Sequence, residues 1–185
     1  MSARPHDEMR CTEMELMDII LKRRSVRKYS GEEISDQVLD KILQAGLLAP
    51  TSRDLKPWEF YAVRDRDVLR KLSASKSAGG AMLAECGAAI AVFGDGVKAD
   101  TWVEDCSIAM SFMMLMAEEL GVGSCWVQIH FRTDASGNAA EDNVRRILGV
   151  DEKYRIAGIL SLGVPAEAPK PRCAEDADWG KVHRV

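Results

Sequence analysis

The sequence lacks the short motifs that mark several large enzyme classes. It holds no G-x-G-x-x-G run after an apolar segment, no Walker A run, no G-x-S-x-G and no H-E-x-x-H. Histidine is scarce: His6 and His183 fall near the two ends, and only His130 lies near an expected core strand. These absences argue against serine hydrolases, zinc enzymes and a histidine-centred catalytic triad.

Cysteine is also sparse and poorly spaced for a structural role. The five cysteines are odd in number and include no C-x-x-C pair, which favours neither a disulfide framework nor a zinc site. They are Cys11, Cys86, Cys106, Cys125 and Cys173. This pattern predicts a reducing, cytoplasmic compartment. We assign no catalysis to Cys106, because a cysteine on an apolar helix usually behaves as a small buried hydrophobe.

Long apolar runs and an excess of positive charge are absent as well. The most apolar stretch, residues 108–117, is shorter than the roughly 20 residues that span a bilayer. The formal net charge of -4 argues against nucleic acid and anionic membranes as partners. The N-terminus has no apolar signal-peptide core, so we expect residues 1–13 to be a flexible leader. One domain should follow over 14–164, with an extended tail over 165–185.

Hydrophobic periodicity predicts alternating helices and strands. Apolar faces predict helices over residues 14–23, 35–47, 69–75, 102–120 and 139–148. Short runs of aromatic and aliphatic residues predict strands over 58–63, 88–93, 123–129 and 155–164. Ser35 suits a helix N-cap, and Gly121 and Gly149 suit helix ends. This order predicts a sheet with helices on its faces, but periodicity alone does not say whether the strands are parallel.

Two features indicate a second copy of the chain. The expected helix over 102–120 has apolar residues on nearly every face, so it should be buried all round. Three prolines punctuate the tail, and Trp179 and Val182 have no local core around them. We therefore expect a homodimer in which the partner covers both features.

Three short segments could converge on a phosphate ester. They are Arg23-Arg24-Ser25-Val26-Arg27, Pro50-Thr51-Ser52 and Lys170-Pro171-Arg172. Guanidinium forks match phosphate oxygens, lysine adds a point charge, and small hydroxyls add directional hydrogen bonds. Taken singly, each segment also fits an ordinary structural role, namely a basic helix end, a turn and a charged linker.

The ordered combination of these segments resembles the nitroreductase family. The family pattern R-R-S-x-R falls at residues 23–27, and A-P-[ST]-S-x-x-x-x-P-W falls at 49–58. The resemblance continues through Trp102-Val103-Glu104-Asp105-Cys106-Ser107-Ile108-Ala109, through Leu120-Gly121-Val122-Gly123, and through Ser161-Leu162-Gly163-Val164-Pro165. It therefore covers nearly the whole chain in order.

The resemblance implies an α+β fold, with a central, mainly antiparallel sheet flanked by helices. It further implies an intertwined homodimer, whose C-terminal extension crosses to the partner, and one FMN in each of two interface clefts. Arg23, Arg24 and Ser25 would bind the phosphate and ribityl end, with the firmest roles for Arg23 and Ser25. Lys170 and Arg172 would close on the phosphate.

Other parts of the implied site surround the flavin ring. Arg27 would lie at the pyrimidine edge, and Pro50, Thr51 and Ser52 would reach across from the other subunit. Trp126, Val127 and Gln128 would run beside the ring, with the Gln128 backbone N–H directed at flavin N5. In purely structural terms, Trp126 and Val127 are strand residues that fill a core, and the two interpretations are compatible.

The implied activity is an FMN-dependent oxidoreductase. It would transfer hydride from NADH or NADPH, through flavin N5, to an electron-poor acceptor such as a nitroaromatic, a quinone or an enone-like compound, by a ping-pong mechanism. No catalytic side chain is required, because the protein contributes orientation, a positive charge and a hydrogen-bond donor. The alternative is a non-enzymatic protein that binds or delivers FMN. A phosphate-ester binder without flavin is a third hypothesis.

Two positions depart from the family pattern. Many relatives have an amide at the position of Asp54 and often a glutamine at that of Lys56. An ionised Asp54 can only accept hydrogen bonds, so a pairing with Arg53 or a surface role is as consistent with the sequence as contact with the flavin.

Overall fold

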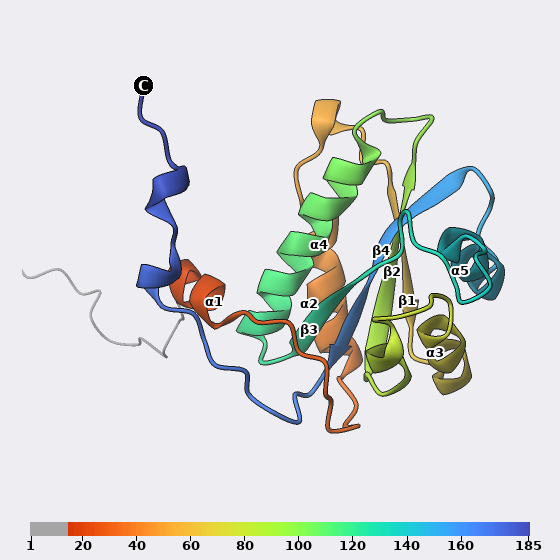
Figure 1. Cartoon of the computed structure of the whole chain (residues 1–185), viewed down its shortest axis with the longest axis horizontal. Helices are drawn as coiled ribbons and strands as arrows, with labels where there is room; N and C mark the ends of the chain where they lie inside the picture. The colour runs from red at the N-terminus through yellow and green to blue at the C-terminus, as the bar shows by residue number, and fades with distance from the viewer. Residues whose placement is uncertain (1–14) are drawn as a thin grey trace, which may run out of the picture.

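The computed structural model describes residues 15–185 and shows an α+β fold (Figure 1). In chain order its helices and strands are α1 (Leu16–Lys22), α2 (Asp36–Leu47), β1 (Trp58–Val63), α3 (Arg66–Ser73), β2 (Ala88–Asp95), α4 (Trp102–Glu119), β3 (Gly123–Gln128), α5 (Ala140–Leu148) and β4 (Tyr154–Gly163). Short 3-10 turns lie at Ser52–Asp54, Ala81–Ala84, Ala174–Asp176 and Trp179–Lys181. All nine expected elements are present in the expected order, and no boundary in the described part moves by more than three residues.

The predicted flexible leader over residues 1–13 lies outside the described residues, as do His6 and Cys11. No helix within residues 15–185 is long and apolar enough to cross a bilayer.

The four strands form one sheet in the order β1-β2-β4-β3. Each neighbouring pair is antiparallel, with Trp58 opposite Gly94 and Gly123 opposite Gly163. The central strands β2 and β4 are buried along most of their length, as their continuous apolar runs predict. β3 is an edge strand, so one side of its backbone is free of sheet pairing.

Helices cover both faces of the sheet (Figure 1). On one face, Ile90 and Val92 of β2 pack with residues of α2 and α4, including Ile42 and Met113. On the other face, Phe93 and its neighbours pack with residues of α3 and α5. The period-2 alternation of β2 therefore divides the core into two layers.

Local chemistry explains several element ends. The Ser35 side chain accepts a hydrogen bond from the Val38 N–H at 3.3 Å and caps α2. Gly149 has φ +67°, the left-handed conformation that ends α5. α3 begins earlier than the sequence suggested, because Asp65 caps it by accepting from two backbone N–H groups.

In a single chain, α4 is buried on one face only. Cys106, Met110 and Met113 are fully buried against the sheet, whereas Ile108 and Phe112 are 37% and 42% exposed. After β4 the tail runs past α1 and ends apart from the body (Figure 1), with Trp179 67% exposed. These exposed apolar side chains are what a partner subunit would cover, and the homodimer itself stays a prediction.

Candidate functional site

The basic segment 23–27 follows α1 and continues along the free edge of β3. Ser25 forms a parallel bridge with Ser124, and the Val26 N–H donates to the Ser124 carbonyl at 2.9 Å. This pairing occurs because the motif places a short extended stretch directly after the helix. It fixes the arginines beside the start of β3.

The C-terminal tail runs back along the same segment. The Arg172 N–H donates to the Leu21 carbonyl at 2.9 Å, and the Ala166 N–H donates to the Lys28 carbonyl at 3.0 Å. The Arg24 guanidinium donates to the Lys170 carbonyl. Residues 23–27 and 170–172, nearly 150 positions apart, therefore lie side by side, as a shared phosphate site requires.

Positive charge accumulates where these two segments meet. The pKa of Arg23 is lowered by burial, then by Arg172 and Arg24, while Glu118 opposes the shift. Burial raises the pKa of Glu118, and Arg23 and Lys22 partly offset that rise. The cluster thus holds several cations around one carboxylate, which is the electrostatic setting of an anion site.

Pro50, Thr51 and Ser52 lie elsewhere in the same chain. The Ser52 N–H donates to Oδ1 of Asp105 at 2.9 Å, in the first turn of α4. Glu118 is in the last turn of α4, and the 13 residues that separate it from Asp105 span about 20 Å at about 1.5 Å per residue. Within one chain, the segment 50–52 therefore does not join the basic cluster.

The loop after Ser52 is strained and firmly held. Arg53, Asp54 and Lys56 have φ of 54°, 54° and 47°, which is unusual for residues other than glycine. The Lys56 N–H donates to the Thr51 hydroxyl at 3.2 Å, and Arg53 forms an ion pair with Asp100. Such conformations persist only where surrounding contacts fix them.

Asp54 pairs with Lys56 at 3.0 Å. The suggested pairing of Asp54 with Arg53 is therefore wrong, because the Arg53 guanidinium reaches Asp100 in the loop before α4. The surface role suggested for Asp54 fits its position, since its side chain is 80% exposed.

The ring-side segment lies on β3. Val127 is buried in the core layer that includes residues of α3 and α5, as its structural interpretation predicts. Trp126 packs against the α4 layer, and its Nε1 donates to Oε1 of Gln128 at 2.8 Å. The Gln128 side-chain amide in turn donates to the His130 carbonyl at 3.0 Å. The Gln128 side chain is thus committed to local hydrogen bonds.

The backbone of β3 presents polar groups on its free side. Ser124 accepts from Val26 across that edge, so its backbone groups point away from β4. Backbone direction alternates along a strand, hence Trp126 and Gln128 point the same way. A Gln128 N–H that faces outward is what the predicted flavin contact requires.

Two side chains near these segments have no role predicted from the sequence. Lys76, in the loop after α3, donates from Nζ to the Gln128 carbonyl at 2.8 Å. Its pKa is lowered by burial and by Arg132. Asp105, which is 2% exposed, accepts from Ser52 and from the Thr101 hydroxyl at 3.1 Å. No local pattern marks Lys76, and Asp105 lies in the matched stretch 102–109 without a predicted role of its own, because both act through contacts with backbone far away in sequence.

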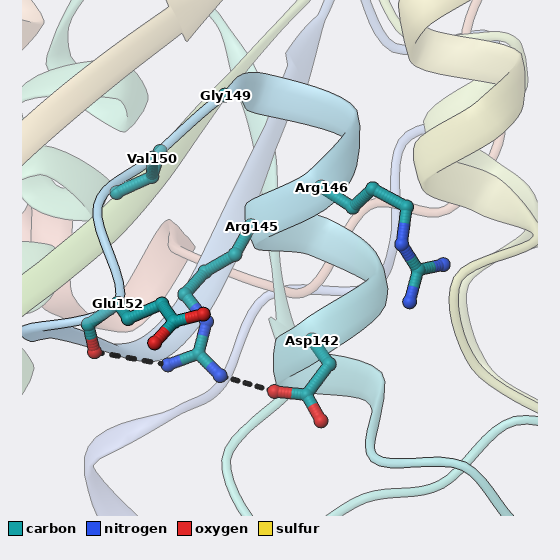
Figure 2. A pocket seen from close by; sticks show the side chains of 6 residues that line it. All are labelled: Asp142, Arg145, Arg146, Gly149, Val150 and Glu152. Atoms are coloured by element: carbon teal, nitrogen blue, oxygen red, sulfur yellow. Dashed lines mark hydrogen bonds and ion pairs between the residues drawn. The ribbon is translucent and has the colours of Figure 1, made fainter.

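One surface hollow adjoins this region, and another lies away from it on α5. One of about 250 Å³ is bordered by Arg24, Val26, Glu118 and the tail prolines, so it adjoins the basic cluster. A hollow of about 690 Å³ lies on α5, where Arg145 pairs with Asp142 and donates to the Glu152 carbonyl (Figure 2). None of the predicted site residues line that second hollow. We give this second hollow no part in the site, because the Arg145 guanidinium already bonds Asp142 and the Glu152 carbonyl.

Comparisons with known proteins agree with this arrangement. The sequence profile of the Nitroreductase family matches residues 20–81 and 74–164. A protein of Archaeoglobus fulgidus named "Putative NADH dehydrogenase/NAD(P)H nitroreductase" is 38% identical over 175 residues, which is 92% of this chain and 97% of the relative.

Solved structures share the fold. The "FMN-dependent Nitroreductase" of Clostridium difficile R20291 superposes with a TM-score of 0.89 at 41% identity, over 91% of this chain and 98% of that one. The NADPH:FMN oxidoreductase of Vibrio harveyi complexed with NAD+ has a TM-score of 0.72 over 92% of this chain and 79% of that one, and at 21% identity it supports the fold alone. The chain therefore belongs to the nitroreductase family, a family of oxidoreductases.

Proposed function

We propose that the chain is an FMN-dependent oxidoreductase that uses NADH or NADPH to reduce an electron-poor acceptor, by a ping-pong mechanism. The acceptor class is a nitroaromatic, a quinone or an enone-like compound. When bound, FMN would supply the redox chemistry, which is hydride transfer from the reduced nicotinamide to the acceptor. The observation that carries the proposal is the meeting of residues 23–27 and 170–172 beside the free edge of β3.

The residues present fit FMN in their chemistry. Guanidinium groups and a small hydroxyl suit a phosphate ester. The cations beside Arg23, Arg172 and Arg24, outnumber the one carboxylate there, Glu118. From Ser124 to Gln128 the strand spans about 13 Å at about 3.3 Å per residue. This length separates the phosphate-binding end, at Ser124, from the ring end, where the Gln128 N–H faces outward.

The roles of individual residues follow from this division. Arg23 and Ser25, with Lys170 and Arg172, hold the phosphate and ribityl end. Arg24 has a smaller share, because its guanidinium is engaged by the Lys170 carbonyl.

Two cations serve the ring end. Arg27 is exposed, and within residues 15–185 its guanidinium makes only a long contact of 3.4 Å with the Ser25 carbonyl, so it is available for the pyrimidine edge. Lys76 adds a positive charge next to Gln128. Both charges favour an anionic form of the ring, while the Gln128 N–H offers a donor to N5.

The site is completed by a second subunit in this proposal. Pro50, Thr51 and Ser52 lie about 20 Å from the basic cluster of their own chain, and they serve the partner's cofactor. The exposed apolar side chains of α4 and of the tail, Ile108, Phe112, Trp179 and Val182, supply contacts for a homodimer whose C-terminal extension crosses to the partner. The four described cysteines are all free, which fits the reducing cytoplasm.

The test starts from the colour of the purified protein. We expect a yellow protein that NADH or NADPH bleaches under anaerobic conditions and that benzoquinone restores. A yellow protein that neither nucleotide bleaches would support FMN storage or delivery instead. A colourless protein whose melting temperature FMN does not raise would contradict flavin binding altogether.

A further inference from the structure

A second cluster of aromatic and charged side chains lies just beyond the ring-side end of β3. Phe131 is 79% exposed and has φ +55°, a strained conformation for an aromatic residue. Its ring contacts the ring of His130 at a tilt of 39°, with centroids 3.9 Å apart. An exposed aromatic held in a strained conformation calls for a functional explanation.

The support beneath Phe131 is rigid and buried. His130 is 8% exposed, and its Nδ1 lies 2.7 Å from Oε1 of Glu141, which is itself 7% exposed. The rings of Trp102 and His130 are nearly perpendicular, with centroids 5.1 Å apart. Arg155 completes the group by donating from Nε to Glu141 at 2.9 Å. The Phe131 ring therefore rests on a fixed platform.

The turn that carries Phe131 is also tied at the backbone. The Arg132 N–H donates to the Ile129 carbonyl at 3.0 Å, and the Ala140 N–H donates to the Arg132 carbonyl at 2.9 Å. These bonds hold the turn in place, so the exposed position of Phe131 is built into the fold.

A hollow of about 580 Å³ opens beside this ring. Its lining includes Phe131, Arg132, Thr133, Glu141, Arg145 and Arg155. Glu141 is shared between His130 and Arg155, and Arg145 pairs with Asp142. Arg132 donates from one guanidinium nitrogen to the Phe131 carbonyl at 2.9 Å and joins no ion pair within residues 15–185. The hollow thus combines an aromatic surface with uncompensated positive charge.

We propose that this hollow binds the adenosine diphosphate half of the reduced nicotinamide dinucleotide. Phe131 stacks on the adenine, and Arg132 with the free edge of Arg155 contacts the phosphates. The proposal rests on the proposed function, since it places the nicotinamide at the ring beside Gln128. Phe131 follows Gln128 by three residues and lies in the turn after β3, so the two are at most about 10 Å apart along the chain and the other half of the same molecule can reach it.

The small acceptors are a poorer match for this hollow. A quinone or nitroaromatic needs only the ring position and has no phosphates for Arg132. A nucleotide joins an aromatic base to two phosphates, which is the combination that the hollow offers.

The first experiment measures binding without turnover. ADP is titrated by calorimetry into the FMN-loaded, oxidised protein. We expect ADP to bind, and Phe131→Ala and Arg132→Ala each to weaken it about tenfold, the order of a lost base stack or charged hydrogen bond. Phe131→Trp should retain binding. Arg146→Ala is the matched control, because Arg146 points away from the Arg145 side of α5 (Figure 2) and bonds Asn143.

The second experiment compares two reductants in anaerobic stopped-flow. NADH carries the adenosine half, and reduced nicotinamide mononucleotide lacks it. In Phe131→Ala and Arg132→Ala, the Kd for NADH should rise about tenfold with the limiting bleaching rate unchanged, while the mononucleotide is unaffected.

Equal effects on both reductants, or an effect confined to the KM of benzoquinone, would overturn the proposal and assign Phe131 to the nicotinamide or the acceptor. The proposal would also be overturned if ADP did not bind and both variants left the Kd for NADH unchanged. A protein without flavin, or one that neither reductant bleaches, would instead show that the proposed function has failed.

Discussion

The two ends of α4 are built in opposite ways. At its C-terminal end, the segment 23–27 and the tail bring flexible, mostly exposed cations together, held by a few backbone hydrogen bonds. At its N-terminal end, the loop after Ser52 has three residues in left-handed conformations and is anchored on the buried carboxylate of Asp105. One end supplies charge, and the other supplies a fixed shape.

This difference fits two distinct tasks at one cofactor. A phosphate is bound by concentrated charge, and long arginine side chains can adjust to it. A planar ring system needs a wall of defined shape, and a strained loop keeps its shape only when its surroundings fix it. The two ends of α4 are about 20 Å apart in one chain. The charged end of one subunit therefore meets the rigid end of another only if the two α4 helices run in opposite directions.

The largest effect should come from removing the most enclosed cation of the charged end. We expect Arg23→Ala to weaken FMN binding by about ten- to a hundredfold, the order of one lost charged hydrogen bond, and to weaken the dimer. Fluorescence titration of the apoprotein with FMN measures the Kd. Arg24→Ala is the matched control, with a smaller loss expected because its guanidinium already bonds the Lys170 carbonyl. Full flavin retention in Arg23→Ala would refute the assignment of the charged end.

A somewhat smaller effect should come from the anchor of the rigid end. Asp105→Ala leaves the Ser52 N–H without its acceptor, which should lower the free energy of unfolding by about 1 to 3 kcal/mol in urea denaturation. Asp105→Asn keeps an acceptor oxygen and should retain most of that stability. Equal losses in both variants would show that the carboxylate charge, and not the hydrogen bond, holds the loop.

The smallest effect is expected at Glu118, the carboxylate beside Arg23 and Lys22. The pKa of Glu118 is raised in the folded chain, so the folded state holds that proton more tightly than the unfolded state does. Stability from this group is therefore present at low pH and is lost as pH rises from about 4.3, the ordinary glutamate value, through the raised folded pKa.

Glu118→Gln should accordingly raise the Tm of the apoprotein slightly at pH 7, with no difference near pH 4. A lower Tm for Glu118→Gln at pH 7 would mean that attraction to Arg23 and Lys22 outweighs the burial of the carboxylate.

Much of the fold could be predicted from the sequence because its signals are local. The Ser35 cap, the glycine after α5 and the continuous apolar runs of β2 and β4 each fix an element without reference to distant residues. The antiparallel pairing could not be derived that way, since strand direction depends on how the chain returns. It came only with the family resemblance.

The candidate site was less predictable for the same reason. The arginines of 23–27 form a visible motif, whereas Asp105 and Lys76 act on backbone groups 53 and 52 positions away. Phe131 carries no sequence signal of its own, and its positive φ and its close contact with the His130 ring are what distinguish it.

The most direct test of the account is a mixed dimer. Arg23→Ala damages the charged end, and Ser52→Trp fills the space at the rigid end; each homodimer should lose flavin. A dimer that combines one chain of each, purified through two different tags, contains one undamaged site if the two ends meet across subunits. We predict that this mixed dimer regains FMN in one of its two sites and is bleached by NADH there. A mixed dimer as empty as both parents would contradict the account.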